Sequence, residues 1–139
     1  MKYAQGEITI DTSEQSIYEI TQEINRWLEQ QSAQQALLTT FIKHTSASLF
    51  IQENASSDVL HDIKNFFKKL VPEDPNLYQH TIEGKDDMPA HLKSLLTQVS
   101  LTIPVRNSQL ELGAWQGVFL FEHRIKKQKR KIHLTLIGK

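Results

Sequence analysis

The part of the chain that most constrains the fold runs from Leu101 to the C-terminus, where strand-like segments follow one another with short links. Residues 101–104, 110–112, 116–123 and 131–137 are rich in apolar, β-branched and aromatic side chains, and a basic turn joins the last two segments. Helices and strands are interspersed earlier in the chain. We therefore predict an α+β fold with two to three helices packed on one face of a mixed or antiparallel sheet, and not a doubly wound parallel fold.

Three amphipathic helices are predicted before these strands. Residues 11–13 have side chains that cap helices, and apolar residues then recur at helical spacing to about Gln31. These apolar residues are Ile17, Ile20, Ile24, Trp27 and Leu28. A second helix over residues 54–70 begins with a capping asparagine, carries a continuous apolar stripe and ends before Pro72. A short third helix over residues 89–96 has proline in its first turn.

The remaining predicted strands are residues 7–10, 37–43 and 48–52. The chain of 139 residues contains no repeat, no low-complexity tract and no linker rich in proline, glycine or serine. A chain of this length fits one domain and can bury roughly two-thirds of its unfolded surface. We therefore predict a single domain over residues 1–139.

Composition excludes several classes of function. The 16 basic residues balance the 16 acidic ones, which argues against general binding of polyanions and leaves self-association unopposed by charge. The absence of cysteine excludes disulfides, thiolate metal sites and cysteine nucleophiles. No apolar run approaches the roughly 20 residues that span a bilayer, and the start lacks a signal-peptide core, so we expect a soluble cytoplasmic protein. No glycine-rich phosphate loop of the Walker or Rossmann type is present.

A polar segment, residues 80–91, concentrates groups that bind metals or transfer protons. It contains His80, His91 and the adjacent acids Asp86 and Asp87. Imidazole nitrogens and carboxylate oxygens are common ligands of divalent metals and common acids and bases of active sites. In one interpretation, both aspartates and His91 converge on a site. In the other, the aspartates only offset the positive end of the third helix, although two adjacent carboxylates also require a positive group to offset their repulsion.

A second candidate follows directly on the strand over residues 37–43. His44, Thr45, Ser46 and Ser48 could bind an anion or a metal, because a strand end presents polar side chains into a cleft. The alternative is a turn whose hydroxyl groups bond to their own backbone. An imidazole adds nothing to such a turn, so we treat His44 as functional.

Two further places carry candidate residues. Residues 113–117 set Trp115 and Gln116 between two glycines that permit a close backbone approach. Trp115 could stack on a flat heteroaromatic ligand while Gln116 binds its polar edge, or it could be an ordinary core residue. On the second helix, Asp58 and Asp62 lie on one flank, and they either face a cation or are simply solvated near the helix start.

Charged residues end the strand over residues 116–123. Adjacent strand residues point to opposite faces, so Glu122 and His123 cannot share one pocket. Glu122 lies on the apolar face and needs a partner if it is covered. The following basic turn is of a kind that is usually solvated, but Arg124 or Arg130 could grip phosphate, because a guanidinium group binds it through two parallel hydrogen bonds.

Together these motifs resemble those of the YjbQ-like family, known as secondary thiamine-phosphate synthases. The similarity spans nearly the whole chain, and the DDMPAH segment and the WQG and EHR motifs are its most specific parts. The matching stretches are HTSASL from His44, ENA from Glu53 with Asp58 and Asp62, Tyr78 and His80, EGKDDMPAH through His91, LTIPV from Leu101, GAWQG from Gly113 and EHR from Glu122. Ala114 replaces the threonine usual in the family, and Asn107-Ser108 replaces a usual glycine, a change that suits asparagine because it tolerates a left-handed turn.

The resemblance implies a compact α+β fold of the YjbQ type, assembled as a homotrimer with polar residues gathered near the subunit interface. It also implies a divalent metal bound by His44, His80 and His91. The implied activity, weak or secondary, joins hydroxymethylpyrimidine pyrophosphate to a thiazole phosphate and releases pyrophosphate. The candidate residues are Asp86, Asp87, His91 and Glu122 for catalysis, and Thr45, Ser46, Ser48, Asn54, Trp115, Gln116, Arg124 and Arg130 for substrate binding.

The chemistry of these residues leaves alternatives open. Release of pyrophosphate needs neutralisation of charge, which a divalent ion together with Asp86, Asp87 and an arginine could supply. Three histidines, however, suit zinc with an open position better than magnesium, which prefers oxygen ligands. A metal-dependent hydrolase or lyase acting on a small phosphorylated or heterocyclic molecule is therefore one alternative. A non-enzymatic trimer that binds a metal or ligand is another, whereas nucleic-acid binding is not expected because the basic run lacks interleaved aromatic residues.

Overall fold

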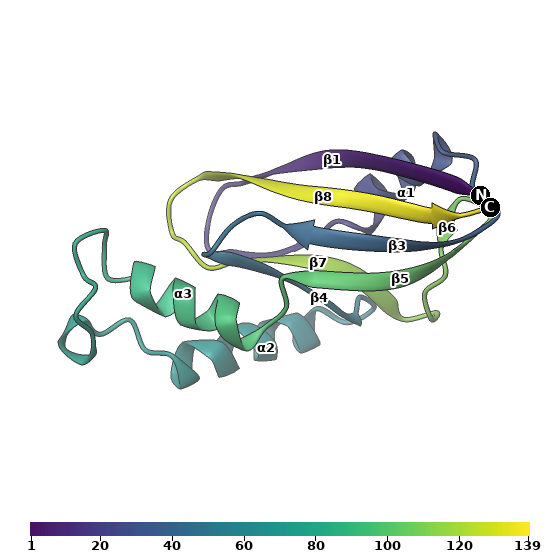
Figure 1. Ribbon diagram of the computed structural model, residues 1–139. Coiled ribbons are helices and arrows are strands. Elements are labelled where there is room, and N and C mark those ends of the chain that lie inside the picture. Colours follow the sequence, from purple (N-terminus) through teal and green to yellow (C-terminus); the bar gives the residue numbers. More distant parts are fainter.

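Two antiparallel β-sheets packed face to face form the centre of the molecule in a computed structural model that describes residues 1–139 (Figure 1). The larger sheet has five strands in the order β1 (Lys2–Thr12), β8 (Gln128–Gly138), β3 (Gln35–Ile42), β5 (Ser100–Arg106) and β6 (Gln109–Leu110). The smaller sheet has three strands in the order β2 (Ser16–Glu19), β7 (Gln116–Glu122) and β4 (Ala47–Glu53). All strand pairs are antiparallel, so the predicted α+β class is confirmed.

Three α-helices surround the two sheets. They are α1 (Thr21–Glu29), α2 (Ser57–Leu70) and α3 (Asp87–Leu96), and a short 3₁₀ turn, Pro75–Leu77, follows α2. Helices α2 and α3 lie on the outer side of the smaller sheet, where Phe67 of α2 packs edge-on against Phe121 of β7 at 5.5 Å between ring centroids (Figure 1). None of the helices has the length and apolar character needed to cross a bilayer.

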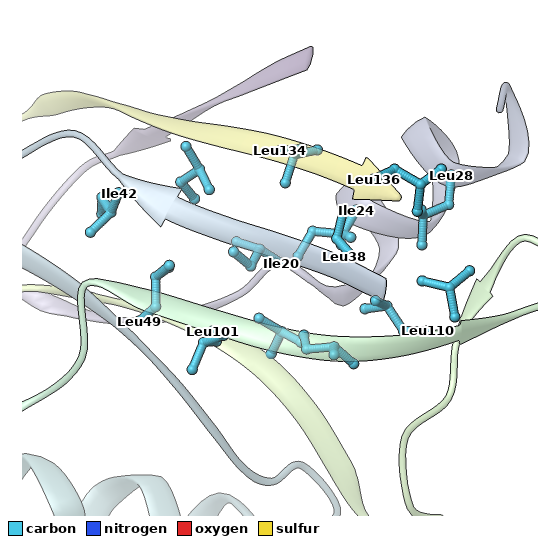
Figure 2. Packing of buried hydrophobic residues seen from close by; sticks show 14 of the residues in the cluster. Ile20, Ile24, Leu28, Leu38, Ile42, Leu49, Leu101, Leu110, Leu134 and Leu136 are labelled. Carbon is cyan, nitrogen blue, oxygen red and sulfur yellow. The ribbon is translucent and has the colours of Figure 1, made fainter. Parts of the chain in front are cut away.

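The hydrophobic core lies between the sheets and is closed by α1 (Figure 2). Along β8, alternate residues Ile132, Leu134 and Leu136 have no exposed surface, as expected of a strand with one buried face. Helix α1 adds Ile24 and Leu28 at helical spacing. Each fully buried side chain of this size contributes roughly 1.5–3 kcal/mol, so this cluster is the main source of stability.

The predicted first helix is wrong in its first half. Residues 11 and 12 extend β1, which pairs with β8 as far as Thr12 and Gln128, and Ile17 lies in β2, which pairs with β7. The helix begins only at Thr21. Ile17, Ile20 and Ile24 share a helical spacing, but the pairing of Ser16–Glu19 with the buried strand β7 overrides that local pattern.

Helix α2 also begins later than predicted. Its N-cap is Ser56, and the predicted cap, Asn54, instead donates a hydrogen bond from Nδ2 to Glu19 Oε2 at 3.1 Å. Its apolar stripe is only partly covered, because Phe66 and Leu70 remain 59% and 53% exposed. The third helix starts at Asp87 and has Pro89 in its first turn, as predicted.

The two-residue turn between β5 and β6 has the left-handed conformation predicted for it. Asn107 and Ser108 have φ angles of 50° and 60°, and the flanking residues Arg106 and Gln109 pair with each other. Positive φ at both central residues suits the twist of a tight hairpin.

Candidate metal centre

Three potential metal ligands meet where the loop before α3 joins the helix. Asp87 and His91 lie four residues apart and therefore on one face of α3, and His80 reaches them from the loop. The Nε2 atoms of His80 and His91 lie 2.6 Å and 3.3 Å from Asp87 Oδ2. One ligand atom from each residue falls within 4.8 Å of the others. Asp87 and His91, two of the residues predicted to form a site in the polar segment, lie side by side here.

Backbone contacts fix the orientation of the His91 ring. Its Nδ1 lies 3.0 Å from the carbonyl oxygen of Thr45. A carbonyl can only accept, so Nδ1 carries the proton and Nε2 faces the Asp87 carboxylate, which also only accepts. Attraction between Nε2 and Oδ2 therefore needs either a second proton on the ring or a cation near both atoms. Metal-ligating histidines are commonly held in this way, through the ring nitrogen opposite the metal.

Arg124 holds the two aspartates together. Its Nε donates to Asp86 Oδ2 at 2.9 Å, its Nη1 donates to Asp87 Oδ1 at 2.7 Å, and its Nη2 donates to the carbonyl of Glu83. The backbone N–H of Ile125 also donates to Asp86 Oδ2. This guanidinium group is the positive group that two adjacent carboxylates were expected to require.

The same contacts keep both aspartates ionised. Burial alone would raise the pKa of Asp87, but the hydrogen bond from His80 and the charges of Arg124 and His91 outweigh it, so the pKa is lowered. Burial would also raise the pKa of Asp86, but the hydrogen bonds from Ile125 and Arg124 outweigh it, so the pKa is lowered. An ionised Asp87 is the form that binds a metal.

The loop conformation depends on Gly84. Its φ is +118°, a value that L-residues rarely adopt, and a Cβ there would lie 2.9 Å from Asp86 Oδ1. Glycine therefore allows the loop to pass close to Asp86 while His80 and Glu83 stay near Asp87. The Glu83 carboxylate lies 3.4 Å from His80 Nε2 and is a further oxygen beside the cluster.

The donor set fits a divalent transition metal. Two imidazoles and one carboxylate are ligand types found in catalytic zinc and non-haem iron sites with open positions. Ligand atoms around a tetrahedral ion lie about 3.3 Å apart when the metal–ligand bonds are about 2.0 Å long. The separation of 3.3 Å between His91 Nε2 and Asp87 Oδ2 matches this value, whereas His80 Nε2, at 2.6 Å from Oδ2, would have to move away from Asp87.

The structure gathers a different set from the three histidines of the prediction, with Asp87 in place of His44. His44 Nε2 accepts a hydrogen bond from the backbone N–H of Lys131 at 2.8 Å. Burial and the nearby charge of Arg130 lower the pKa of His44, which favours the neutral ring. His44 therefore joins the end of β3 to the start of β8, and it is the next residue, Thr45, that contacts the cluster.

Glu122 and Arg130 form a buried ion pair between the sheets. Arg130 Nε donates to Glu122 Oε1 at 2.7 Å, and Thr12 Oγ1 donates to the same oxygen at 2.6 Å. Glu122 is 0% exposed and Arg130 is 3% exposed. Arg130 also binds the carbonyl and hydroxyl oxygens of Ser46. The partner expected for a covered Glu122 is therefore present, and it occupies the guanidinium group that was predicted to grip phosphate.

His123 points to the other side of β7, as predicted from the alternation of strand residues. Its Nε2 lies 2.9 Å from Ser48 Oγ, its ring packs on Phe121, and its Nδ1 has no partner. Ser48 is 0% exposed and also accepts from Thr97. Burial, together with the charges of Lys93 and Arg130, lowers the pKa of His123 to about 3.

The predicted aromatic subsite lies at the opposite end of β7. Trp115 is 66% exposed, so the alternative of an ordinary core tryptophan is wrong. Gln116 Oε1 accepts from the backbone N–H of Gly113, and Trp115 O accepts from the backbone N–H of Asn54. Glu122 lies six positions after Gln116 along the strand, a distance of roughly 20 Å. Within one chain, the structure does not bring Trp115, Gln116 and Asn54 to the metal centre.

Sequence analysis missed Lys93, a lysine on the buried side of α3. It is 3% exposed and follows Ala90, which is fully buried, by three residues. Its spacing from Ala90 places it on the same face of the helix, but lysine is usually exposed, so no signal in the sequence marked it as buried.

The fold and the cluster define an α+β protein with a histidine–aspartate centre at the start of a helix. The chain belongs to the UPF0047 family of YjbQ-like proteins, whose pattern matches residues 6–139. It is 46% identical over 131 residues to UPF0047 protein sll1880 of Synechocystis, covering 94% of this chain and 89% of that protein. It is 39% identical to UPF0047 protein YjbQ of Escherichia coli O157:H7, covering 96% and 97%.

Solved structures agree with the fold. The crystal structure of a YbjQ-like protein of unknown function from Sulfolobus solfataricus superimposes with a TM-score of 0.88, covers 99% of both chains and is 22% identical. At this identity the likeness shows the fold alone. The names of these relatives give a family and no activity, so an activity has to be argued from the site.

Proposed function

We propose that this chain is a metal-dependent enzyme that hydrolyses or cleaves a small phosphorylated or heterocyclic molecule, with the metal held by His80, Asp87 and His91. The observation that carries the proposal is the convergence of three ligand atoms within 4.8 Å of one another. A divalent ion in such a site acts as a Lewis acid towards a phosphoryl or carbonyl oxygen. Zinc is the metal we expect.

Each surrounding residue has a role that follows from its contacts. Arg124 is a positioning residue, because its hydrogen bond to Oδ1 leaves Oδ2 of Asp87 directed at the histidines. The Thr45 carbonyl positions His91 by holding its Nδ1 proton. A metal bound at His80 Nε2 would displace the proton that this atom donates to Asp87, and the 45% exposed side chain lets that proton pass to solvent.

The thiamine-phosphate synthase activity implied by the family resemblance has weaker support from the geometry. Such a transferase must neutralise a leaving pyrophosphate. Arg124 is engaged by Asp86 and Asp87, and Arg130 is buried against Glu122, so neither guanidinium group is free for phosphate. We keep this activity as the second candidate because Asp86 and Asp87 are adjacent carboxylates, the ligand type that magnesium prefers, and Arg124 occupies one oxygen of each.

Self-association as a homotrimer would place the two ends of β7, each from a different subunit, beside one substrate. Trp115 is too far along the strand to reach the metal centre of its own chain. In a cyclic trimer, the Trp115 end of one subunit can lie against the His91 end of the next. The exposed Phe66 and Leu70 on α2 supply apolar surface for such contacts.

Elemental analysis of untagged protein, purified without chelators, tests the proposal. We expect about one transition-metal ion per chain, lost in His91→Ala and retained in His133→Ala, which changes a histidine of β8 outside the cluster. Equal metal content in both variants, or no metal in the wild type, would contradict the proposed centre.

Activity assays then separate the two candidates. Metal-dependent cleavage of phosphomonoesters or heterocyclic amides that is lost in His91→Ala supports the hydrolase or lyase. Release of pyrophosphate from the two thiamine precursors, with magnesium and without a transition metal, would instead support the transferase. An Arg124→Lys variant should keep cleavage activity but bind the metal more weakly, because a lysine cannot hold both aspartates in one plane.

A further inference from the structure

A second polar hollow lies between α2, α3 and the smaller sheet. It has a volume of about 200 Å³ and eight lining residues, of which Phe121 is the only apolar one. Three of the others are Lys64, Lys68 and Lys93, and none is acidic. His80, Asp87 and His91 do not line it, so the hollow is separate from the metal centre.

Lys93 is the most informative of these residues. It is 3% exposed, yet its ammonium group takes part in no hydrogen bond or ion pair within the chain. His123 Nδ1 is the only fully enclosed side-chain polar atom without a partner, so the Lys93 nitrogen must reach the surface of the hollow. A buried ammonium without a partner is costly, and a bound anion would remove that cost.

Helix α2 directs further positive charge to the same place. His61, Lys64, Asn65 and Lys68 recur at the spacing of one helix face. Lys64 and Lys68 are four residues apart, a spacing at which like charges destabilise a helix. No carboxylate in the hollow offsets them. Glu73 and Asp86 act electrostatically on Lys93 from outside the lining, and Glu73 accepts a hydrogen bond from Gln15 Nε2 at 2.8 Å.

We propose that this hollow binds the phosphate group of a small anionic ligand, with Lys64, Lys68 and Lys93 as its charged contacts. Ammonium groups bind phosphate as point charges, and the Asn65 amide and the Ser16 hydroxyl of the lining add neutral hydrogen-bonding groups. The volume is below the roughly 300–1,000 Å³ typical of sites for drug-sized ligands, so the ligand is inorganic phosphate or a small phosphomonoester.

Calorimetric titration with inorganic phosphate and with glycerol phosphate, at constant ionic strength and with EDTA present, tests the site. We expect saturable binding of at least one of them by the wild type. Lys93→Met keeps the length of the side chain and removes its charge, and it should weaken binding tenfold or more. Lys68→Gln should weaken binding about threefold. Tighter binding of glycerol phosphate identifies a phosphomonoester site, and tighter binding of phosphate identifies a site for the free anion.

Lys69→Gln is the matched control, because Lys69 neighbours Lys68 on α2 but does not line the hollow. It should leave phosphate affinity unchanged, and His91→Ala should do the same. The proposal fails if the wild type shows no saturable binding, if Lys69→Gln weakens binding as much as Lys68→Gln, or if Lys93→Met leaves affinity intact. If Lys93→Met does not fold, the difference in phosphate affinity between Lys68→Gln and Lys69→Gln still tests the proposal.

Discussion

The two ends of strand β7 differ in how their side chains are partnered. At its C-terminal end, Glu122 is paired with Arg130 inside the protein, and Arg124 ties Asp86 and Asp87 to the start of α3. At its N-terminal end, Trp115 stands 66% exposed. One end has many charges that neutralise one another, and the other has an aromatic surface with little to cover it.

This difference indicates which end of β7 has its interactions satisfied within one chain. A buried charge is costly unless it is paired, so the paired charges at the C-terminal end hold that end in place within one chain. A solvent-exposed tryptophan imposes no such requirement, and its large apolar surface suits a partner subunit or a ligand. The proposed metal centre therefore lies at the end whose charges are paired within one chain, whereas Trp115 is open to a partner subunit or a ligand.

The largest expected effect comes from breaking the buried ion pair. Glu122→Gln leaves the Arg130 guanidinium buried without its counter-charge and should lower the free energy of unfolding by about 3–5 kcal/mol, measured by urea denaturation. The double variant Glu122→Leu/Arg130→Met removes both charges and should be more stable than either single variant. If the loss of unfolding free energy in the double variant equals the sum of the losses in the two single variants, the two side chains do not stabilise the fold through their interaction.

The next effect is a loss of stability in mild acid caused mainly by His123, with a further part from His44, whose pKa is also lowered. The pKa of His123 is lowered to about 3 in the folded state, so the unfolded chain takes up a proton near pH 6.5 while the folded chain does not. Stability is therefore complete above about pH 6.5 and falls towards pH 3, by up to about 1.4 kcal/mol per pH unit. His123→Gln should flatten this profile between pH 6 and about pH 4, measured by urea denaturation at each pH.

The aspartates act in a separate window and serve as the internal control. The lowered pKa values of Asp86 and Asp87 stabilise the fold above their unfolded value, near pH 4, and this contribution is lost only as the pH falls below it. A wild type that keeps full stability at pH 4.5 would contradict the assignment to His123.

A smaller loss of stability is expected at the N-terminal end of β7, where the backbone passes close to polar side chains. A Cβ on Gly117 would lie 2.6 Å from Glu19 Oε2 and 3.1 Å from Asn54 Nδ2. Gly117→Ala should therefore cost about 1 kcal/mol, because side-chain ends must move and the hydrogen bond between them is strained. Gly113→Ala, where the nearest atom is Gln116 Oε1 at 3.2 Å, should cost less. Equal losses in thermal denaturation would show that the closeness of the contact at each glycine does not set the cost.

The smallest effect on stability should come from Trp115→Ala. An exposed side chain contributes little, so we expect a change of less than about 0.5 kcal/mol at concentrations where the chain is monomeric. Self-association, measured by analytical ultracentrifugation, should weaken in this variant and not in Leu77→Ala, which changes another exposed apolar residue. Unchanged association would remove Trp115 from the proposed subunit contact.

Local patterns predicted the α+β class, the third helix and the polar segment over residues 80–91. Alternation along the strands identified the different sides of Glu122 and His123. The prediction was wrong over residues 11–20, where helix-like capping and spacing lie in strands β1 and β2 and their connection. It named three histidines as metal ligands, whereas the structure places Asp87 beside His80 and His91, at a helix start that Arg124 contacts from 37 residues away.

The sequence by itself determined the balance of charge, the run of closely linked strands and the groups available for metal binding. The tertiary structure decided which of these groups meet. In the fold, Glu122 pairs with Arg130, and His44 accepts a hydrogen bond from the backbone of Lys131. Lys93 is buried without a partner. The physical reason is that periodicity along the chain records which face of an element is buried, whereas the pairing of buried charges depends on elements that are distant in sequence and close only in the fold.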